Sequence, residues 1–404
     1  MATEKGDGRA GSKGLGDLER LRGLTCIKWT RYPADVIPAW VADMDLPPAP
    51  VTVDAVDVLV QRGDFGYNML ATSRLPEVFS QWQSRRHGWE PDARCVRLFC
   101  DVMQGMAVSL WLGTEPGDGV VLLTPTYPPF FSTIEGTGRR VVECPLDPDG
   151  WRLDPERLAS VVDEGTRAIV FCNPHNPTGR VFDASELAAI ASIAERHDLL
   201  VLSDEIWGDL VHPGAVHVPF ALVSDDAARR TVTVTAASKA FNVAGLHCAV
   251  AHVGHTTLRK KMNDLPPHVL GAVGTPGAEA TLAAWSRGEP WLGTTRQYLT
   301  EARDHVAARL STELPRVGFT VPDATYLAWL DVHDYSLGED PAGWLLEHAR
   351  VALSSGNDFG VHGEGFVRMN MATSMEILDL IIDRMVAALA DAPRVANPRG
   401  GGRT

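Results

Sequence analysis

The sequence predicts an α/β fold with a mostly parallel central sheet and a smaller α+β lobe towards the C-terminus. Short apolar runs alternate with helical patterns along most of the chain, and these runs are continuous rather than alternating in polarity. Continuous apolar strands are typical of parallel sheets that are covered on both faces. A change of pattern from about residue 295 predicts the smaller lobe.

Five short runs rich in β-branched and aliphatic residues are predicted to be strands of the main sheet. They span residues 119–123, 140–144, 168–172, 199–203 and 231–235. The helical patterns between them include 185–197, where apolar residues recur at spacings of three and four. A helix is also expected over 106–112.

The smaller lobe is predicted from a helix, short strands and two further helices. These elements are a helix over 295–310, a strand over 326–331, a helix over 341–350 and a final helix from Ser374. The expected organisation is a tail at 1–18, a segment at 19–48 that packs with the small domain, a large α/β domain at 49–290, a small α+β domain at 291–393 and a flexible tail at 394–404.

Composition limits the classes of function. The chain has 404 residues and a formal net charge of −14, which argues against nucleic acid or an anionic membrane as its main partner. Its six cysteines form no CxxC pair, so neither a metal site nor a disulfide framework is expected. With no signal-peptide pattern and no apolar run of about 20 residues, we expect a cytoplasmic enzyme.

Three chemically distinct side chains follow neighbouring predicted strands. Asp204 follows the strand at 199–203, Lys239 follows the strand at 231–235, and Asn176 lies in an Asn-Pro-Thr-Gly sequence after a third strand. Ligands of α/β sheets collect at the carboxyl ends of the strands. An amine, a buried carboxylate and an amide at that edge suit pyridoxal 5′-phosphate, which needs an amine for its aldehyde and an acid for its pyridine nitrogen.

Each of these residues then has an expected role. Lys239 would hold the aldehyde and return as the base that removes the substrate Cα proton. Asp204 would pair with the pyridine nitrogen, and Asn176 would donate to the phenolic oxygen. Tyr127 would stack on the ring, and Gly105-Met106 would open a helix whose free amides face the phosphate.

Arg368 stands in an apolar run near the end of the chain, where its guanidinium could grip a substrate α-carboxylate through two hydrogen bonds. Each residue also has a structural interpretation. Asp204 could cap a helix, Asn176 could form a turn, and Arg368 could belong to a structural ion pair.

The motifs as a series resemble the fold-type I pyridoxal-phosphate enzymes of the class I/II aminotransferase superfamily, which share the PLP-dependent transferase fold. The series is Asn-Pro-His-Asn-Pro-Thr-Gly179, Ser-Asp-Glu-Ile206 and Ser-Lys-Ala-Phe-Asn242. Within that superfamily, Ile37-Pro-Ala-Trp-Val-Ala-Asp-Met-Asp45 and Asn-Val-Ala-Gly-Leu246 resemble the MalY/PatB-type cystathionine β-lyases, or C–S lyases. The resemblance covers about residues 25–392.

The resemblance implies further site residues and a partner. Tyr67 would reach the phosphate of a neighbouring subunit, so the active form would be a homodimer with shared active sites. The stretch Trp40-Val41-Ala42 would line the substrate pocket and bind substrate. Trp207 and Ser238 would lie beside the cofactor.

Four positions depart from the family pattern. Ala236 replaces a Ser or Thr that usually binds phosphate, and His247 stands where related transaminases have an arginine. Trp207 replaces a His or Tyr, and Gln104 replaces a proline. Phosphate anchoring is therefore expected to differ from that of relatives.

The resemblance implies a C–S β-lyase that cleaves an S-substituted cysteine, either cystathionine-like or a cysteine S-conjugate of specialised metabolism, to thiol, pyruvate and ammonia. Transamination shares the early steps and stays an alternative. So does a decarboxylating or oxidatively deaminating relative that acts on a cysteine S-conjugate in antibiotic biosynthesis. A regulatory role through partner binding is a further alternative. Neither the sulfur substituent nor the choice among these outcomes follows from the motifs.

Overall fold

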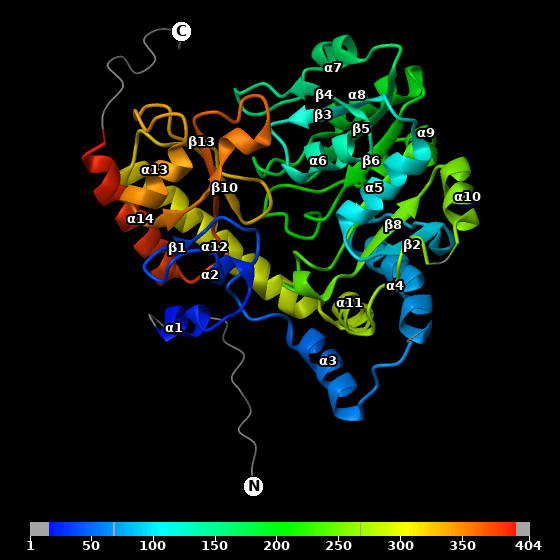
Figure 1. Cartoon of the computed structure of the whole chain (residues 1–404), viewed down its shortest axis with the longest axis horizontal. Helices are drawn as coiled ribbons and strands as arrows, with labels where there is room; N and C mark the ends of the chain where they lie inside the picture. The colour runs from blue at the N-terminus through cyan, green and yellow to red at the C-terminus, as the bar shows by residue number, and fades with distance from the viewer. Residues whose placement is uncertain (1–15, 68, 267, 393–404) are drawn as a thin grey trace.

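The main feature of the computed structural model is a mostly parallel sheet of seven strands, in the order β2-β8-β7-β6-β5-β3-β4 (Figure 1). The structure describes residues 16–67, 69–266 and 268–392. The strands are β2 (Val96–Phe99), β3 (Gly119–Thr124), β4 (Arg140–Pro145), β5 (Thr166–Cys172), β6 (Leu200–Asp204), β7 (Thr231–Thr235) and β8 (Ala249–Val253). Only β8 runs antiparallel to its neighbours.

The five strands expected from the sequence are β3 to β7, with ends that differ by at most two residues. Alternate side chains of these strands enter two separate cores, which explains why the runs are continuously apolar. Leu202 packs in one core and Val201 in the other. The sequence prediction missed β2 and β8. Each carries a polar or charged residue, Arg97 and His252, within its apolar run.

Helices cover both faces of this sheet. They are α3 (Pro50–Arg62), α4 (Met69–His87), α5 (Val102–Gly113), α6 (Pro129–Gly136), α7 (Pro155–Val161), α8 (Ala184–Arg196), α9 (Asp225–Arg230), α10 (Thr256–Asp264) and α11 (Thr275–Arg287). The predicted helix at 185–197 is α8, and a capping box between Asp183 and Glu186 fixes its start. Among the residues that the structure describes, each helix is too short or too polar to span a lipid bilayer.

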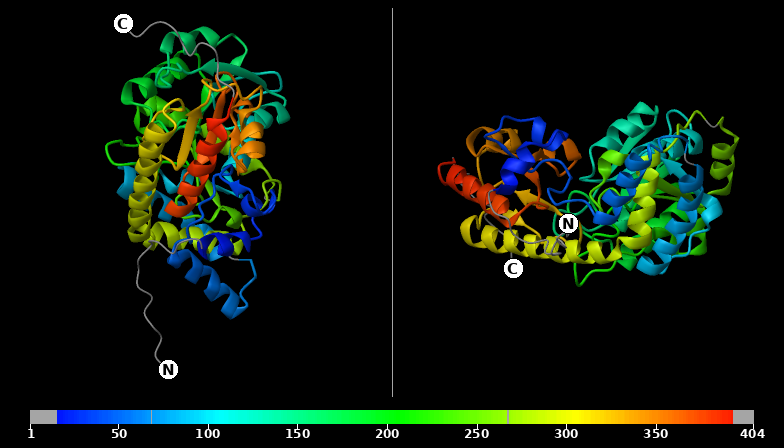
Figure 2. Two further views of the ribbon diagram at one scale, coloured as in Figure 1. Left: turned by 90° about the vertical axis from the view of Figure 1, so that its left-hand side faces the viewer. Right: turned by 90° about the horizontal axis from the view of Figure 1, so that it is seen from below.

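A second, four-stranded sheet has the order β12-β13-β10-β9 and carries the smaller lobe. Its strands are β9 (Gly318–Phe319), β10 (Leu327–Asp331), β12 (Ser354–Ser355) and β13 (Phe366–Asn370), and its helices are α12 (Glu289–Glu313), α13 (Pro341–His348) and α14 (Met375–Ala390). We call this part the small lobe and the part around the seven-stranded sheet the large lobe. In the right-hand view of Figure 2, helix α12 (yellow) runs along the lower edge of the molecule from the large lobe to the small lobe.

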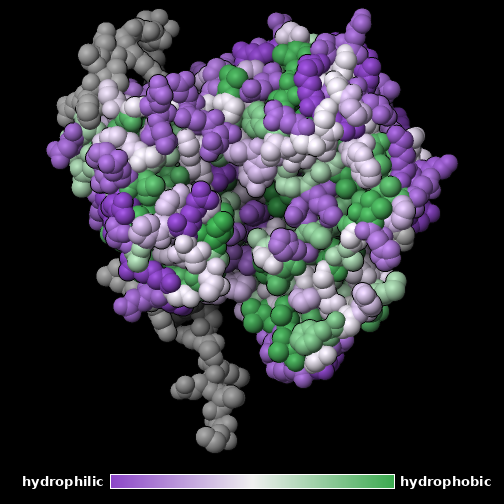
Figure 3. All heavy atoms as spheres, in the orientation of Figure 1, coloured by the Kyte–Doolittle hydropathy of each residue, from purple (hydrophilic) through white to green (hydrophobic). Residues whose placement is uncertain are grey.

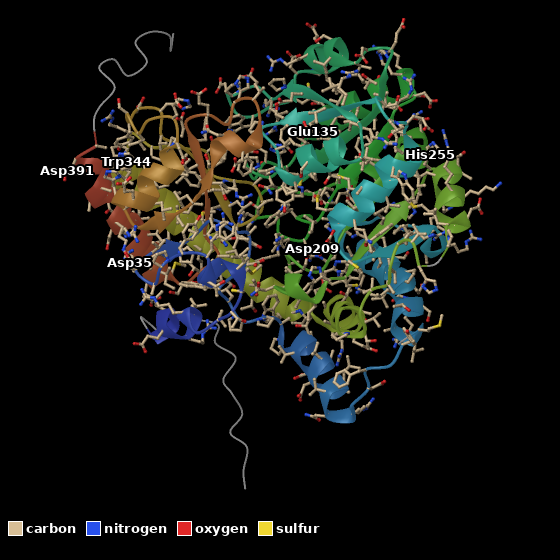
Figure 4. All side chains as sticks on the ribbon, viewed as in Figure 1. Asp35, Glu135, Asp209, His255, Trp344 and Asp391 are labelled. Carbon is tan, nitrogen blue, oxygen red and sulfur yellow. The ribbon has the colours of Figure 1, made fainter. Side chains whose placement is uncertain are left out.

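The N-terminal segment joins the small lobe before it reaches the large one. It forms α1 (Gly16–Arg22), α2 (Ile27–Thr30) and β1 (Ile37–Pro38), and β1 pairs with β11 (Val351–Ala352). Asp35, labelled in Figure 4 on the small-lobe side, accepts a 2.8 Å hydrogen bond from Arg350.

Beyond β1 the N-terminal segment crosses between the lobes. Ala39 belongs to the small-lobe core, whereas Ala42 and Met44 belong to a large-lobe core. We propose the domain division at about residue 290 on the basis of these cores. The expected tail at 1–18 is wrong at its end, because α1 begins at Gly16. Its remaining residues and the tail at 394–404 lie outside the described residues.

Candidate active site

The carboxyl ends of neighbouring parallel strands carry the residues expected from the sequence. Asp204 is the last residue of β6, and Asn176 and Lys239 each lie four residues beyond the ends of β5 and β7. Tyr127 follows β3. Because these four strands are adjacent and parallel, their carboxyl ends meet at one edge of the sheet.

A cavity of about 260 Å³ lies at this edge. Nine of the expected residues line it, namely Val41, Ala42, Tyr127, Asn176, Asp204, Trp207, Ser238, Lys239 and Arg368. In the space-filling view the surface is hollowed between the two lobes (Figure 3). A larger hollow, about 900 Å³, lies elsewhere around Glu143 and His333 and contains none of the expected residues.

Lys239 is held by the N-terminal segment. Its Nζ donates to the carbonyl oxygen of Ala42 at 2.8 Å and lies 3.9 Å from Oδ1 of Asp43. Burial lowers the pKa of Lys239, and the charge of Asp43 opposes that shift. A lowered pKa favours the neutral amine, which is the form that attacks an aldehyde or takes a proton.

Asp204 is a buried carboxylate that faces the cavity. The residue is 3% exposed, and Oδ1 accepts a hydrogen bond from the backbone N–H of Ile206 at 3.0 Å. Burial raises the pKa of Asp204 to about 7. Within the described residues it has no ion-pair partner, so a ligand that donates an N–H from the cavity would satisfy it.

Arg368 is a buried guanidinium at the other lobe. Its Nη1 donates to Oδ1 of Asn176 at 2.9 Å, and Nη2 donates to the carbonyl of Trp40 at 3.0 Å and to Oγ of Ser354 at 3.1 Å. Burial lowers the pKa of Arg368 to about 10. No carboxylate pairs with it in the part of the chain that the structure describes. The structural ion pair is therefore not found there, and an anion that entered the cavity could pair with this guanidinium.

Trp207, which lines the cavity, packs against the buried ring of Tyr326. Their ring centroids are 4.8 Å apart in an edge-to-face arrangement. The hydroxyl of Tyr326 donates to the carbonyl of Ala42 at 2.8 Å, so this carbonyl accepts from both Tyr326 and Lys239. The sequence offered no signal for Tyr326, because it begins an apolar run that looks like an ordinary strand.

The predicted start of the helix at Met106 is wrong. Helix α5 begins at Val102, with Asp101 as its N-cap. The N–H of Gly105 is bonded to the carbonyl of Asp101, and both Gly105 and Met106 are buried away from the cavity. The backbone N–H groups without a partner in a helix are those of its first turn. In α5, the first-turn residues that line the cavity are Val102 and Met103.

Trp40 and Tyr67 are not among the residues that line this cavity. The Trp40 side chain instead packs against Tyr32, with ring centroids 6.1 Å apart, and lines a separate hollow of about 290 Å³. Of the Trp40-Val41-Ala42 stretch, only Val41 and Ala42 reach the site. Tyr67 is fully exposed between α3 and α4.

Several lining residues were not predicted, among them Asp101, Met103 and Ala244, whereas Ala236 and His247, noted above as departures from the family pattern, also line the cavity. Asp43 was also missed, although it lies in the quoted motif. Asn242, in the lysine motif, has a left-handed backbone with φ 56°, which asparagine tolerates. Lys239 and Asn242 contact the N-terminal segment, which is about 200 residues away in the sequence, so a local motif could not predict these contacts.

The match to a known family decides the identity of the chain. Residues 103–385 match the family described as aminotransferase class I and II. The chain belongs to that family. It is 35% identical over 382 residues to the cystathionine β-lyase PatB of Bacillus subtilis, covering 92% of this chain and 98% of PatB.

Two solved structures extend the likeness to the fold. The PLP-bound C–S lyase of Staphylococcus hominis has a TM-score of 0.87 at 29% identity, and the match covers 92% of this chain and 97% of that one. Cystalysin of Treponema denticola, whose crystals contain pyridoxal 5′-phosphate, has a TM-score of 0.85 at 28% identity, with coverage of 92% and 97%. The predicted family and fold type are confirmed.

Proposed function

We propose that the chain is a pyridoxal-phosphate-dependent C–S β-lyase that cleaves an S-substituted cysteine to thiol, pyruvate and ammonia. The observation that carries the proposal is the convergence of Lys239, Asp204 and Arg368 on one cavity. Relatives and structural neighbours described as cystathionine β-lyases and C–S lyases support it.

The groups around the cavity fit the cofactor. Lys239 offers an amine of lowered pKa for the aldehyde, and Asp204 offers a buried carboxylate without an ion-pair partner in the described residues for the pyridine nitrogen. The N-terminal amides of α5 and the hydroxyl of Ser238 would hold the phosphate. When bound, pyridoxal phosphate supplies a ring that withdraws the electron pair left on the substrate carbon.

The cofactor's ring would have two further neighbours. Tyr127 lines the cavity and would stack on it, and Trp207 lines the same cavity beside Asp204. The Oδ1 of Asn176 is already committed to Arg368, which leaves its amide N–H₂ as the group that would donate to the phenolic oxygen. The hydrogen bond from Arg368 to Asn176 would therefore connect the residue that binds the substrate carboxylate to a residue that binds the cofactor.

The chain's own residues would divide the remaining work. Arg368 would bind the substrate α-carboxylate, which every amino acid carries, through its planar guanidinium. Lys239 would take the proton from Cα, and Asp204 would keep the pyridine nitrogen protonated. Val41 and Ala42 would lie along the substrate and limit access of water to the reacting carbon.

The test is product analysis with an S-alkyl or S-aryl cysteine, with and without a keto acid. We expect stoichiometric thiol and pyruvate without any keto acid, and slow reaction of alanine, which has no leaving group at Cβ. Turnover only with a keto acid would instead identify an aminotransferase, the other activity that the family includes. Release of carbon dioxide or an aldehyde with the thiol still attached would favour the decarboxylating or oxidative alternative.

The proposal includes a homodimer in which Tyr67 reaches the partner's cofactor phosphate. An exposed apolar surface on α3, on the loop after it and at the start of α4 supports it, because clustered apolar surfaces often mark interfaces. Its residues are Val53, Val58, Val60, Phe65, Tyr67, Met69 and Leu70, and apolar colouring gathers over α3 in Figure 3. A cytoplasmic location belongs to the same proposal, because all six cysteines are free thiols.

A further inference from the structure

Two oxygens of the N-terminal segment hold the amine of Lys239 in place. The carbonyl of Ala42 accepts from Nζ at 2.8 Å, and the carboxylate of Asp43 lies 3.9 Å away. At this separation the Asp43 carboxylate can stabilise a positive charge on the amine. The Asp43 side chain is 30% exposed, so the carboxylate also keeps part of its hydration. Neither oxygen belongs to the groups that would hold the cofactor.

The small-lobe side fixes the backbone that carries these two oxygens. Asn370 donates through Nδ2 to the carbonyls of Val41 and Asp43, both at 2.7 Å. Nζ of Lys28 donates to the same Asp43 carbonyl at 2.9 Å and forms a buried ion pair of 2.9 Å with Asp45. Asp43 is therefore anchored by its main chain, which leaves its side chain available to Lys239.

The large-lobe side fixes the following residues of the same segment. Asn242, three residues after Lys239, donates through Nδ2 to the carbonyls of Met44 at 3.1 Å and Leu46 at 2.7 Å. Its Oδ1 accepts from the N–H of Met44 at 3.2 Å. The loop that carries Lys239 and the segment that carries Asp43 are thus bonded to each other directly, so the separation of the two side chains is set by the fold.

The charged groups around Lys239 act in opposite directions. Burial lowers the pKa of Lys239 and Arg368 lowers it further, whereas Asp43 and, more weakly, Asp204 raise it. Asp204 would be engaged with the cofactor in the proposed reaction, and Arg368 with the substrate. Asp43 is then the one carboxylate in this set that stays available to the amine throughout the reaction.

We propose that Asp43 is a positioning residue for the proposed reaction, the counter-ion that holds the Lys239 ammonium beside the cavity after proton transfer. The inference rests on the proposed function. In that transfer the Cα–H bond breaks, an N–H bond forms on Nζ, and the electron pair stays with the substrate. Lys239 changes from neutral amine to ammonium, and Asp43 remains a carboxylate. The carbonyl oxygen of Ala42 accepts a hydrogen bond from the ammonium.

The test compares Asp43→Asn with Asp43→Glu in two assays. The first is the pH dependence of pyridoxal-phosphate capture by the cofactor-free chain, followed by absorbance and by borohydride fixation to Lys239. Loss of the carboxylate favours the neutral amine, so the midpoint of capture for Asp43→Asn should fall by about half a pH unit, the scale of a partly exposed ion pair. Asp43→Glu should restore the midpoint.

The second assay is turnover of an S-substituted cysteine by the cofactor-loaded enzyme. Here Asp43→Asn should slow kcat by roughly threefold to tenfold, because the weaker base and the unpaired ammonium both raise the barrier. Earlier capture and slower turnover together form the signature, since a merely disordered segment would slow both. If Asp43→Asn does not fold, Asp43→Ser, also uncharged and smaller, should give the same pair of changes.

Asp35→Asn is the control, because Asp35 lies in the same N-terminal segment but pairs with Arg350 on the small lobe. It should leave the midpoint and kcat unchanged. An unchanged midpoint in an Asp43→Asn variant that binds the cofactor would overturn the inference and leave the proposed function intact. Failure of the unmodified chain to capture pyridoxal phosphate at all would overturn the proposed function, and this inference with it.

Discussion

Asp204 and Arg368 are each buried without an ion-pair partner among the described residues. A buried charge without a partner is costly, and a carboxyl group answers that cost by a raised pKa. Asp204 does so, with a pKa of about 7, and the pKa of Arg368 falls to about 10. Groups of this kind are kept where a ligand completes them, which is the pattern of a functional site.

Asp204→Asn should stabilise the cofactor-free protein at pH 8 while it abolishes most activity. The pKa of Asp204 rises from 3.8 to about 7 on folding, so its contribution to stability is complete below about pH 4 and is lost as the pH rises through 7. The amide has no such loss. Its advantage in unfolding free energy should grow to at most about 4 kcal/mol at pH 8.

Urea unfolding of both cofactor-free proteins at pH 5 and pH 8 measures this difference. Turnover of cofactor-loaded Asp204→Asn should fall by about two orders of magnitude. Asp226→Asn is the control with the opposite sign, because Arg230 lowers the pKa of Asp226 and the variant should lose stability at pH 8. Near-normal turnover in a cofactor-bound Asp204→Asn protein would contradict the assigned role.

Arg368→Met should raise KM for cysteine conjugates while cofactor content stays normal. The lost partner is charge-assisted, so the expected cost is about 1.5–3 kcal/mol in kcat/KM, or roughly 10- to 150-fold. Arg309→Met is a matched control, because Arg309 forms ion pairs with Glu313, Asp379 and Asp383 away from the cavity. It should change stability and leave KM unaltered. An unchanged KM in Arg368→Met would make Arg368 a structural residue.

At the scale of elements, the start of α5 decides where an anion can bind. Asp101 caps the helix by accepting from the N–H of Gln104 at 2.8 Å, and the Gln104 side chain accepts from the N–H of Cys100 at 2.8 Å. This arrangement resembles a capping box, and Asp-Val-Met-Gln is visible in the sequence. Gly105 was predicted to open the helix, but it lies inside the helix, where the lack of a side chain lets the helix pack against Phe99 and Val234.

Val102→Pro should weaken binding of pyridoxal phosphate by about tenfold or more, because it deletes one first-turn amide and a hydrogen bond to a charged group is worth about 1.5–3 kcal/mol. Proline suits the first position of a helix, and Asp101 before it is already extended with ψ 172°. Equilibrium titration of the cofactor measures the change. Thr256→Pro, at the first position of α10 after extended His255, controls for a new proline and should leave binding unchanged.

At the scale of the whole molecule, the cavity is built by parts distant in the sequence. The large lobe supplies Lys239 and Asp204, the small lobe supplies Arg368, and the N-terminal segment supplies Ala42. Tyr67 lies on an exposed apolar surface rather than in the cavity of its own chain. The proposed partner subunit would cover that surface.

Mixing two inactive variants tests the shared site. Lys239→Ala lacks the amine, and Tyr67→Ala should lack the phosphate contact. A heterodimer of the two contains one site with both residues intact, so mixing should restore activity that neither variant has alone. Sedimentation should also show Val60→Asp, in the apolar surface, shifting towards monomer, with Val216→Asp at an exposed valine elsewhere as control. No restored activity in a mixture that forms dimers would place Tyr67 outside the site.

Local sequence patterns were enough to predict the parallel sheet, the positions of β3 to β7 and the group of residues at their carboxyl ends. These features depend on local patterns, because a strand buried on both faces is continuously apolar and ligands of such sheets bind at the carboxyl ends of the strands. The family motifs predicted site roles for Lys239, Asp204 and Asn176, and each of these residues lies at a strand end or four residues beyond one.

The contacts of those residues could not be predicted from the sequence, because they depend on how distant segments pack together. The absence of an acidic partner for Arg368 among the described residues, the bonds from Lys239 to Ala42 and Asp43, and the exclusion of the Trp40 side chain from the cavity follow from packing between segments far apart in the chain. Hydrogen bonds and burial act through space, so the pattern along the sequence cannot express them. The charge state of the site is therefore a property of the fold.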